Sequence, residues 1–258
     1  MARIRTGIPE FDEMLSGGFM PSDAVMVAGS AGTGKTTLAL QYIVNGITKF
    51  GENGIYLSFE QMPDQIYRDA GSFGWDLKKL ENEGKFRVVL SSPNVLFAEG
   101  GENLLDEIIK EVGAKRIAID SLSHLTMFVS EEKMRLESYR LVCFLKARGV
   151  SALYLWEAPQ LMGTAISVTE VGMSFLVDCI VALRTVEIES EIRKGLVVLK
   201  MRGSDHDKRL REYEITSTGM KVFSPFDQYQ GLMTGSPTRI GSERFKELFS
   251  TAAKGNKK

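Results

Sequence analysis

Short apolar runs alternate, over the first 160 residues, with longer segments whose apolar residues follow a helical spacing. The runs are rich in Val, Ile and Ala and predict buried strands; they are DAVMVAG at 23–29, GIYLSF at 54–59, FRVVL at 86–90, RIAID at 116–120 and VSALYLW at 150–156. Helical patterns cover residues 35–49, 62–72, 101–112 and 131–148. This alternation predicts an α/β fold with a mainly parallel central sheet flanked by helices on both faces.

The pattern changes after residue 178, where strand-like segments follow one another without helices between them. They are CIVALRTVEIE, KGLVVLKMRG and LREYEIT, separated by charged or Gly-containing turns. Such a series predicts an antiparallel C-terminal extension at one edge of the sheet. Because the sequence contains no convincing linker, we expect one domain over residues 1–234 and a C-terminal arm over residues 235–258.

Composition narrows the classes of function. The chain of 258 residues carries 32 basic and 33 acidic side chains, and this balance gives it no overall attraction for nucleic acid or anionic lipid. Cys143 and Cys179 lie in apolar runs and are expected to be buried thiols, which suits a reducing cytoplasm. No segment has the pattern of a signal peptide or of a membrane span. We therefore expect a cytoplasmic protein.

The most specific motif is GSAGTGKT, which directly follows a predicted strand and opens a predicted helix. Its glycines let successive backbone N–H groups turn toward one anion, and the helix N-terminus adds positive potential. This pattern predicts a P-loop that binds ATP with Mg²⁺, in which Lys35 reaches the β- and γ-phosphates and the Thr36 hydroxyl ligates the metal. The expected ATP-binding residues are Gly29, Ser30, Ala31, Gly32, Thr33, Gly34, Lys35, Thr36 and Thr37.

Two acidic residues follow other predicted strands. Asp120 lies at the carboxyl end of the strand at 116–120, where ligands of open α/β sheets bind, and is the second expected magnesium residue beside Thr36. Glu60 follows the strand at 54–59 and is the candidate general base that orients water against the γ-phosphate. From its position alone, Glu60 also fits a helix-capping or surface acid.

Several segments, in this order and spacing, resemble the KaiC family of RecA-like ATPases. They are TGIPEFDEMLSGG, the P-loop, LSFEQ, RIAIDSLSHL, KMRGSDHDKRLREYEIT and TGSPTRI. They are most similar to the second of the two tandem ATPase domains of clock-type members, whereas this chain holds one such domain. The resemblance implies a RecA-like P-loop NTPase fold and a homo-oligomeric ring, usually a hexamer, with Mg-ATP between subunits.

The same resemblance implies that a neighbouring subunit completes each site. Carried over by position, Lys200 and Arg202 would reach the γ-phosphate across the interface as catalytic and ATP-binding residues, with His206 close by. Independently of the family, residues 191–211 carry seven basic side chains against three acidic ones, which suits an anion supplied from outside the P-loop. The alternative for this basic cluster is the solvated face of an edge strand.

The chain departs from the family pattern at two places. Gln61 follows Glu60 where the family usually has a second Glu, so we expect ATP hydrolysis to be slow. Clock-type members phosphorylate themselves on adjacent Ser and Thr residues, whereas this chain has Ser174 followed by Phe175. Because Phe cannot accept a phosphate, any Ser/Thr autokinase activity would use Ser174 or the nearby Thr169, and Ser174 also fits a plain helix-face hydroxyl.

Three functions stay open at this point. The leading interpretation is an ATP-hydrolysing ring whose nucleotide state controls assembly and the binding of an unidentified regulatory protein. A RadA- or RecA-like recombinase or helicase shares the core, although the neutral charge does not favour a nucleic-acid partner. An ATP-sensing scaffold with little turnover is the third, and Gln61 supports it.

His124 is interpreted as a packed or capping side chain, and Glu157 as a residue poorly suited to contact phosphate.

Overall fold

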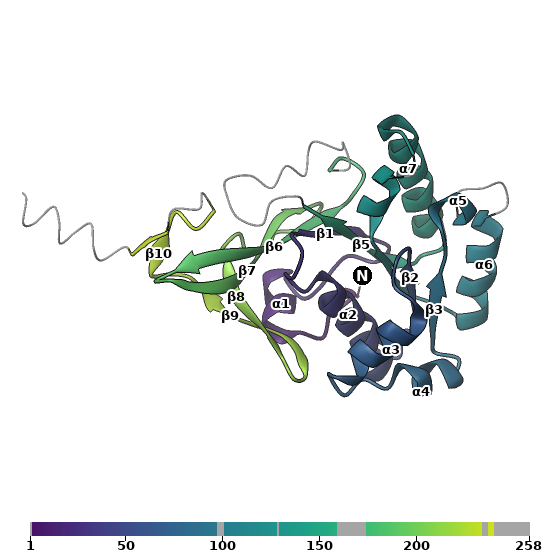
Figure 1. Cartoon of the computed structure of the whole chain (residues 1–258), viewed down its shortest axis with the longest axis horizontal. Helices are drawn as coiled ribbons and strands as arrows, with labels where there is room; N and C mark the ends of the chain where they lie inside the picture. Colours follow the sequence, from purple (N-terminus) through teal and green to yellow (C-terminus); the bar gives the residue numbers. More distant parts are fainter. Residues whose placement is uncertain (1, 97–100, 128, 159–173, 234–236, 240–258) are drawn as a thin grey trace, which may run out of the picture.

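The structure is a computed structural model that describes residues 2–96, 101–127, 129–158, 174–233 and 237–239. Its centre is a nine-stranded sheet in the order β3-β2-β4-β5-β1-β6-β7-β8-β9 (Figure 1). Neighbouring strands from β3 to β6 run parallel, and β7 to β9 continue the sheet as antiparallel strands. The mainly parallel sheet with flanking helices and an antiparallel C-terminal extension, expected from the sequence, is confirmed.

The elements have the following bounds. The strands of the large sheet are β1 (Ala24–Gly29), β2 (Gly54–Ser58), β3 (Phe86–Leu90), β4 (Arg116–Asp120), β5 (Ser151–Glu157), β6 (Cys179–Ile188), β7 (Glu191–Met201), β8 (Arg211–Thr216) and β9 (Gly219–Pro225). A separate two-stranded sheet pairs β10 (Tyr229–Gln230) with β11 (Thr238–Arg239). The helices are α1 (Pro9–Met14), α2 (Lys35–Phe50), α3 (Pro63–Gly71), α4 (Leu77–Asn82), α5 (Pro93–Leu96), α6 (Gly101–Val112) and α7 (Glu131–Ala147), with a 3₁₀ helix at Leu122–Met127.

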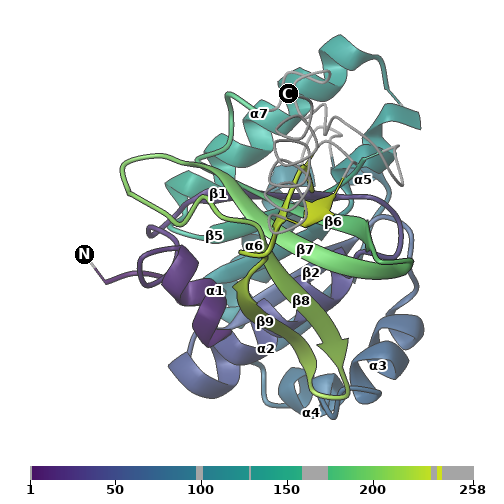
Figure 2. The same cartoon turned by 90° about the vertical axis from the view of Figure 1, so that its left-hand side faces the viewer.

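Each face of the sheet has its own hydrophobic core. Successive side chains of a strand point to opposite faces, so Val25 and Val27 of β1 join a cluster with α2, while Met26 and Ala28 join a cluster with α6 and α7. Strand β1 is buried at every position because helices cover it on both sides. Figure 2 shows α1 and α2 on one side of the sheet and α7 on the other.

The expectation that Cys143 is buried was wrong. Cys143 is exposed on α7, whereas Cys179 is buried in β6. In the run LVCFL the neighbours Leu141, Val142, Phe144 and Leu145 all face the core. A helix turns about 100° per residue, so a buried stripe formed by these four positions directs the intervening side chain toward solvent.

The topology brings the P-loop, Glu60 and Asp120 to the same end of the parallel strands. The strands β1, β2, β4 and β5 are parallel, and their register pairs Ser58 with Asp120 and Gly29 with Glu157. Their carboxyl ends therefore meet along a single edge, which is where open α/β sheets bind their ligands. Strand β7 runs in the opposite direction, so its carboxyl end with Lys200 lies at the other edge, where Lys200 pairs with Ile180.

Candidate functional site

The loop between β1 and α2 is built to approach a ligand closely. Gly32 and Gly34 have φ angles of +75° and +88°, which glycine adopts without strain. A Cβ atom on Gly29 would lie 2.7 Å from both the Leu183 carbonyl oxygen and Thr33 Oγ1, so only glycine fits there. Helix α2 begins at Lys35, and no side chain in the described ranges caps its N-terminus. The first-turn N–H groups are thus available to an anion, and the loop residues fit a bound phosphate group.

Lys35 lies against this loop. Its side chain is buried, and its Nζ donates hydrogen bonds to the carbonyl oxygens of Gly29 and Ser30, at 2.9 and 3.0 Å. Burial lowers the pKa of Lys35, and this effect is opposed by the nearby carboxylates of Glu157 and Asp120. A desolvated ammonium group held only by carbonyl oxygens has strong affinity for an additional negative charge, such as a phosphate.

Thr36 and Asp120 meet at the metal position that the sequence predicts. The Thr36 hydroxyl donates to Asp120 Oδ2 at 2.8 Å, and the Tyr56 hydroxyl donates to the same oxygen. Burial raises the pKa of Tyr56, and Asp120 raises it further, so the phenol stays protonated and remains a donor. A hydroxyl and a carboxylate are ligands that Mg²⁺ accepts, together with phosphate oxygens and water. Among the described residues no group of three or more His, Cys, Asp or Glu gathers as a metal site.

Glu60 lies just past the end of β2. The Ser58 hydroxyl accepts hydrogen bonds from the backbone N–H groups of Glu60 and Gln61, which fixes the turn. The Glu60 side chain is 67% exposed, and its Oε2 lies 3.4 Å from His124 Nε2. The interpretation of His124 as a packing residue did not include this contact, because the sequence gives no sign that the two loops adjoin.

Two further side chains brace the loop, a role that the sequence did not indicate for either of them. The Tyr213 hydroxyl of β8 donates to the Thr33 carbonyl, and Lys194 Nζ of β7 donates to the Gly32 carbonyl at 2.8 Å. Lys194 belongs to the basic cluster found in the sequence, but Tyr213 had no distinguishing signal. The antiparallel extension therefore supports the loop from outside the parallel strands.

Lys200 and Arg202 lie away from their own loop. Lys200 Nζ donates to the carbonyl oxygens of Ser174 and Val177, at 2.6 and 2.7 Å, and Arg202 donates to the Phe175 carbonyl at 2.8 Å. Burial lowers the pKa of Lys200, and the neighbouring Arg202 lowers it further. The structure thus brings the two cations together with the Ser174 segment and not with Lys35.

The other two sequence candidates lie near this opposite edge. His206 sits in the loop between β7 and β8, and its buried Nδ1 has no hydrogen-bond partner within the part of the chain that the structure describes. That loop is attached to the N-terminal segment, because Arg3 donates to Ser204 Oγ and the Asp207 N–H donates to the Met14 carbonyl. Ser174 is half-buried, whereas Thr169 lies outside the described residues.

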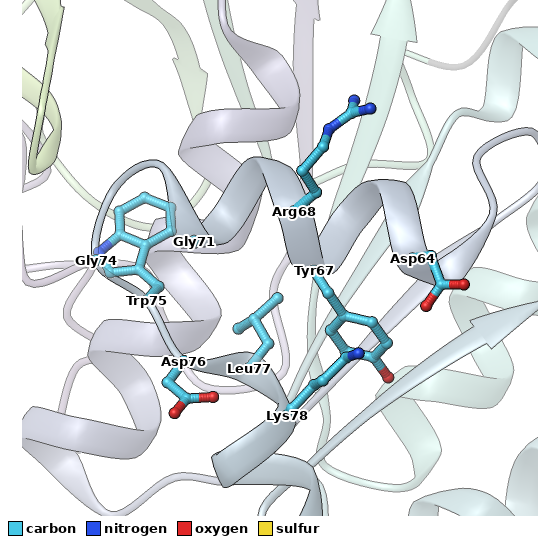
Figure 3. A pocket seen from close by; sticks show the side chains of 9 residues that line it. All are labelled: Asp64, Tyr67, Arg68, Gly71, Gly74, Trp75, Asp76, Leu77 and Lys78. Atoms are coloured by element: carbon cyan, nitrogen blue, oxygen red, sulfur yellow. The ribbon is translucent and has the colours of Figure 1, made fainter.

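A separate hollow of about 650 Å³ lies between α3 and α4. Tyr67, Trp75 and Leu77 form its apolar wall, with charged side chains such as Asp64 and Lys78 at the rim (Figure 3). None of the residues expected to bind ATP or Mg²⁺ lines it.

None of the helices in the described part of the chain is long and apolar enough to cross a membrane.

Comparison with known proteins agrees with this geometry. The chain is 36% identical over 246 residues to the circadian clock protein KaiC3 of Synechocystis sp., covering 95% of this chain and 48% of that protein. It is 34% identical over 253 residues to the circadian clock oscillator protein KaiC of Thermostichus vulcanus, covering 98% and 48%. For the protein of the same name from Rippkaea orientalis the identity is 35% over 247 residues, covering 96% and 47%. The chain thus spans about half the length of the curated relatives that it matches.

The family assignment rests on a match to a family model over most of the chain. A sequence model of the KaiC ATPase covers residues 4–226, which include the loop, Lys35, Asp120 and the whole nine-stranded sheet. The same range holds the paired Thr36 and Asp120 side chains. The chain belongs to the KaiC ATPase family.

Proposed function

We propose that this chain binds Mg-ATP and hydrolyses it slowly, as a ring-forming regulatory ATPase. The observation that carries the proposal is the hydrogen bond of 2.8 Å between Thr36 and Asp120, directly beside the uncapped N-terminus of α2. It joins a hydroxyl and a carboxylate, which suit Mg²⁺, to a loop that suits phosphate. A Gly-rich turn without a ligand would need neither the buried Lys35 nor this pair.

Each residue has a definite part in the proposed reaction. The N–H groups of residues 31–36 and the Lys35 ammonium hold the phosphates, and Thr36 and Asp120 hold the metal. Bound Mg²⁺ would supply positive charge that offsets the charge developing on the transferred phosphoryl group. Glu60 accepts the proton of the attacking water through its exposed carboxylate. Gln61, whose buried Oε1 has no partner among the residues described, cannot share that proton as an acid would.

A neighbouring copy of the chain completes the site in this proposal. Arg202 lies beside Asp178, which pairs by its backbone with Ala24 at the start of β1. Five residues of extended chain separate Ala24 from Gly29, roughly 16 Å, so Arg202 is distant from its own loop. A ring in which each copy presents Lys200, Arg202 and His206 to the next loop resolves this separation, and we propose a hexamer from the family resemblance.

Autophosphorylation at Ser174 is a second candidate activity. Its carbonyl accepts a hydrogen bond from Lys200, so Ser174 lies at the same edge as the cations proposed to reach a neighbour's γ-phosphate. The hydroxyl of Ser174 would then be within the region where that phosphate is transferred. We propose that the nucleotide state of the assembled ring controls this activity and the binding of a regulatory protein.

One incubation tests both activities. Purified protein is incubated with Mg-ATP, and released phosphate and intact protein mass are measured for the wild type and for Lys35→Ala. We expect slow phosphate release by the wild type and none by the variant. A phosphate adduct on the wild type alone, lost in Ser174→Ala, supports the autokinase. Equal phosphate release by wild type and Lys35→Ala would refute the ATPase assignment.

A further inference from the structure

A continuous series of polar contacts runs across the carboxyl ends of the parallel strands. The N–H of Glu157 donates to Ser123 Oγ at 3.2 Å, and Ser123 Oγ lies 2.7 Å from Ser121 Oγ. Ser121 Oγ lies 3.2 Å from His124 Nδ1, and His124 Nε2 lies 3.4 Å from Glu60 Oε2. This series of contacts therefore connects the end of β5 to the carboxylate of the proposed general base.

Every hydrogen bond in this series can be donated in the same direction, from Glu157 toward His124. Ser123 Oγ accepts the hydrogen of the Glu157 N–H, so its own hydrogen is free for Ser121 Oγ. The Ser121 hydroxyl can then donate to His124 Nδ1. An imidazole that accepts at Nδ1 carries its hydrogen on Nε2, which is the nitrogen that faces Glu60.

We propose that His124 is a positioning residue that orients the Glu60 carboxylate through its Nε2–H. The proposal rests on the proposed function, because it assigns a role to a residue beside the general base of that reaction. The side chain of His124 is only 21% exposed, whereas that of Glu60 is 67% exposed. A long exposed side chain samples many rotamers, and a donor anchored in the wall of the site restricts them.

The identity of the neighbouring residue explains why such help is needed. Gln61 follows Glu60, and among the described residues its buried Oε1 has no hydrogen-bond partner. An amide carries no charge and cannot share a proton with the Glu60 carboxylate as a second acid would. His124 approaches from the 3₁₀ helix at Leu122–Met127, which follows directly from the strand of Asp120. The segment of residues 116–127 therefore carries both the metal carboxylate and the side chain that orients the base.

Kinetics of three substitutions at one position test the proposal. His124→Ala should lower kcat for ATP hydrolysis by about tenfold with little change in KM, because only orientation of the base is lost. His124→Gln places an amide N–H near the position of Nε2 and should restore most of the loss. His124→Asn carries the same amide on a shorter stem, which does not reach Glu60, and should behave like alanine. Equal activity of all three variants and the wild type would overturn the proposal.

A double substitution separates positioning from general damage to the fold. Since His124 acts only through Glu60, His124→Ala should cause no further loss of kcat in a Glu60→Gln background. Losses that multiply in the double variant would show that His124 acts independently of Glu60 and would overturn the proposal. Mant-ATP binding, measured on each variant in the same buffer, should stay within about twofold of the wild type.

Nuclear magnetic resonance gives a readout that does not need turnover. The chain has two histidines, so ¹⁵N labelling of histidine gives few signals, and the His124 signals are those absent from His124→Gln. We expect the Nε2–H tautomer in the wild type and a mixture of tautomers in Ser121→Ala. The Nε2 signal should move in Glu60→Ala and stay unchanged in the control Glu111→Ala. The proposal would be overturned by an Nδ1–H tautomer in the wild type, or by an Nε2 signal that is the same in the wild type and in Glu60→Ala.

The two measurements also separate this inference from the ATPase assignment. If the wild type releases no phosphate, the proposed function fails, and the tautomer and its dependence on Glu60 alone decide whether the pair exists. If the wild type hydrolyses ATP but His124→Ala has an unchanged kcat, the ATPase assignment stands and the inference fails. Loss of kcat together with the expected tautomer supports both.

Discussion

Thr36 and Asp120 are 84 positions apart in the sequence, and the Thr36 hydroxyl donates a hydrogen bond of 2.8 Å to Asp120 Oδ2. Thr36 belongs to the first turn of α2, and Asp120 is the last residue of β4. Strand β4 is separated from β1 by β5, so the loop after β1 must cross the end of β5 to bring these side chains together. This is the arrangement that a metal between a P-loop and a strand-end carboxylate requires.

The first prediction concerns this pair. Thr36→Ala removes a hydroxyl ligand and should lower kcat/KM for Mg-ATP by about ten- to a hundredfold, with a higher Mg²⁺ concentration needed for half-maximal rate. Thr36→Ser keeps the oxygen and should lose less than about threefold. The measurement is a Mg²⁺ titration of phosphate release at fixed ATP. Identical Mg²⁺ dependence of both variants would remove Thr36 from the metal site.

The second prediction compares two glycines. A Cβ atom at Gly29 would lie 2.7 Å from the backbone oxygen of Leu183, whereas at Gly71 it would meet nothing within 4 Å. Gly29→Ala should therefore displace the loop and weaken mant-ATP binding by about tenfold or more. Gly71→Ala, at the end of α3, should bind like the wild type. Fluorescence titration decides the matter, and tight binding by Gly29→Ala would contradict the loop geometry.

The third prediction tests the shared site in solution. Arg202→Ala and Lys35→Ala should each be nearly inactive alone. In a ring mixed at equal amounts, about a quarter of the interfaces join an intact loop to an intact Arg202, and activity should recover to about that fraction. Subunits are mixed under conditions that allow exchange, and phosphate release is followed with time. A mixture no more active than its two components would refute a site shared between copies.

The fourth prediction is a pH dependence of stability. Burial raises the pKa of Asp23 to about 6, assisted by the nearby Asp178 carboxylate and opposed by a hydrogen bond from the Met20 N–H. The folded chain thus retains a proton that the unfolded chain releases near pH 4. Because the folded state binds more protons in this range, the free energy of unfolding should fall as pH rises from about 4 to about 6.

Asp23→Asn should remove that part of the pH dependence. The amide oxygen can still accept from Met20, so we expect the variant to be about 1–2 kcal/mol more stable than the wild type at pH 7 and no more stable at pH 4. Urea unfolding at both pH values gives the comparison, with exposed Asp227→Asn as the control. A gain at pH 4 as large as that at pH 7 would exclude ionisation as its cause.

Most of the larger elements could be predicted from the sequence, whereas α1, α4 and β9 were not among the expected segments. The strands at 86–90 and 116–120 have the expected bounds, and α2 begins at Lys35 as the motif requires. These features depend on neighbouring residues: the period of the apolar side chains, and the glycines of the loop. The exposed position of Cys143 was missed because a continuous apolar run does not show which of its side chains face the core when it forms a helix.

The sequence by itself determined the strand and helix elements, the phosphate-binding loop and the family resemblance, because each is written in residues close together or in a recognisable order. Only the tertiary structure decided that Lys200 faces away from its own loop, that Tyr213 braces Thr33, and that His124 meets Glu60. These relations depend on strand order and register, which are set by burial of both faces of the sheet at once. No local pattern encodes which strand ends become neighbours, so the partners of the site residues emerge only when the whole sheet is assembled.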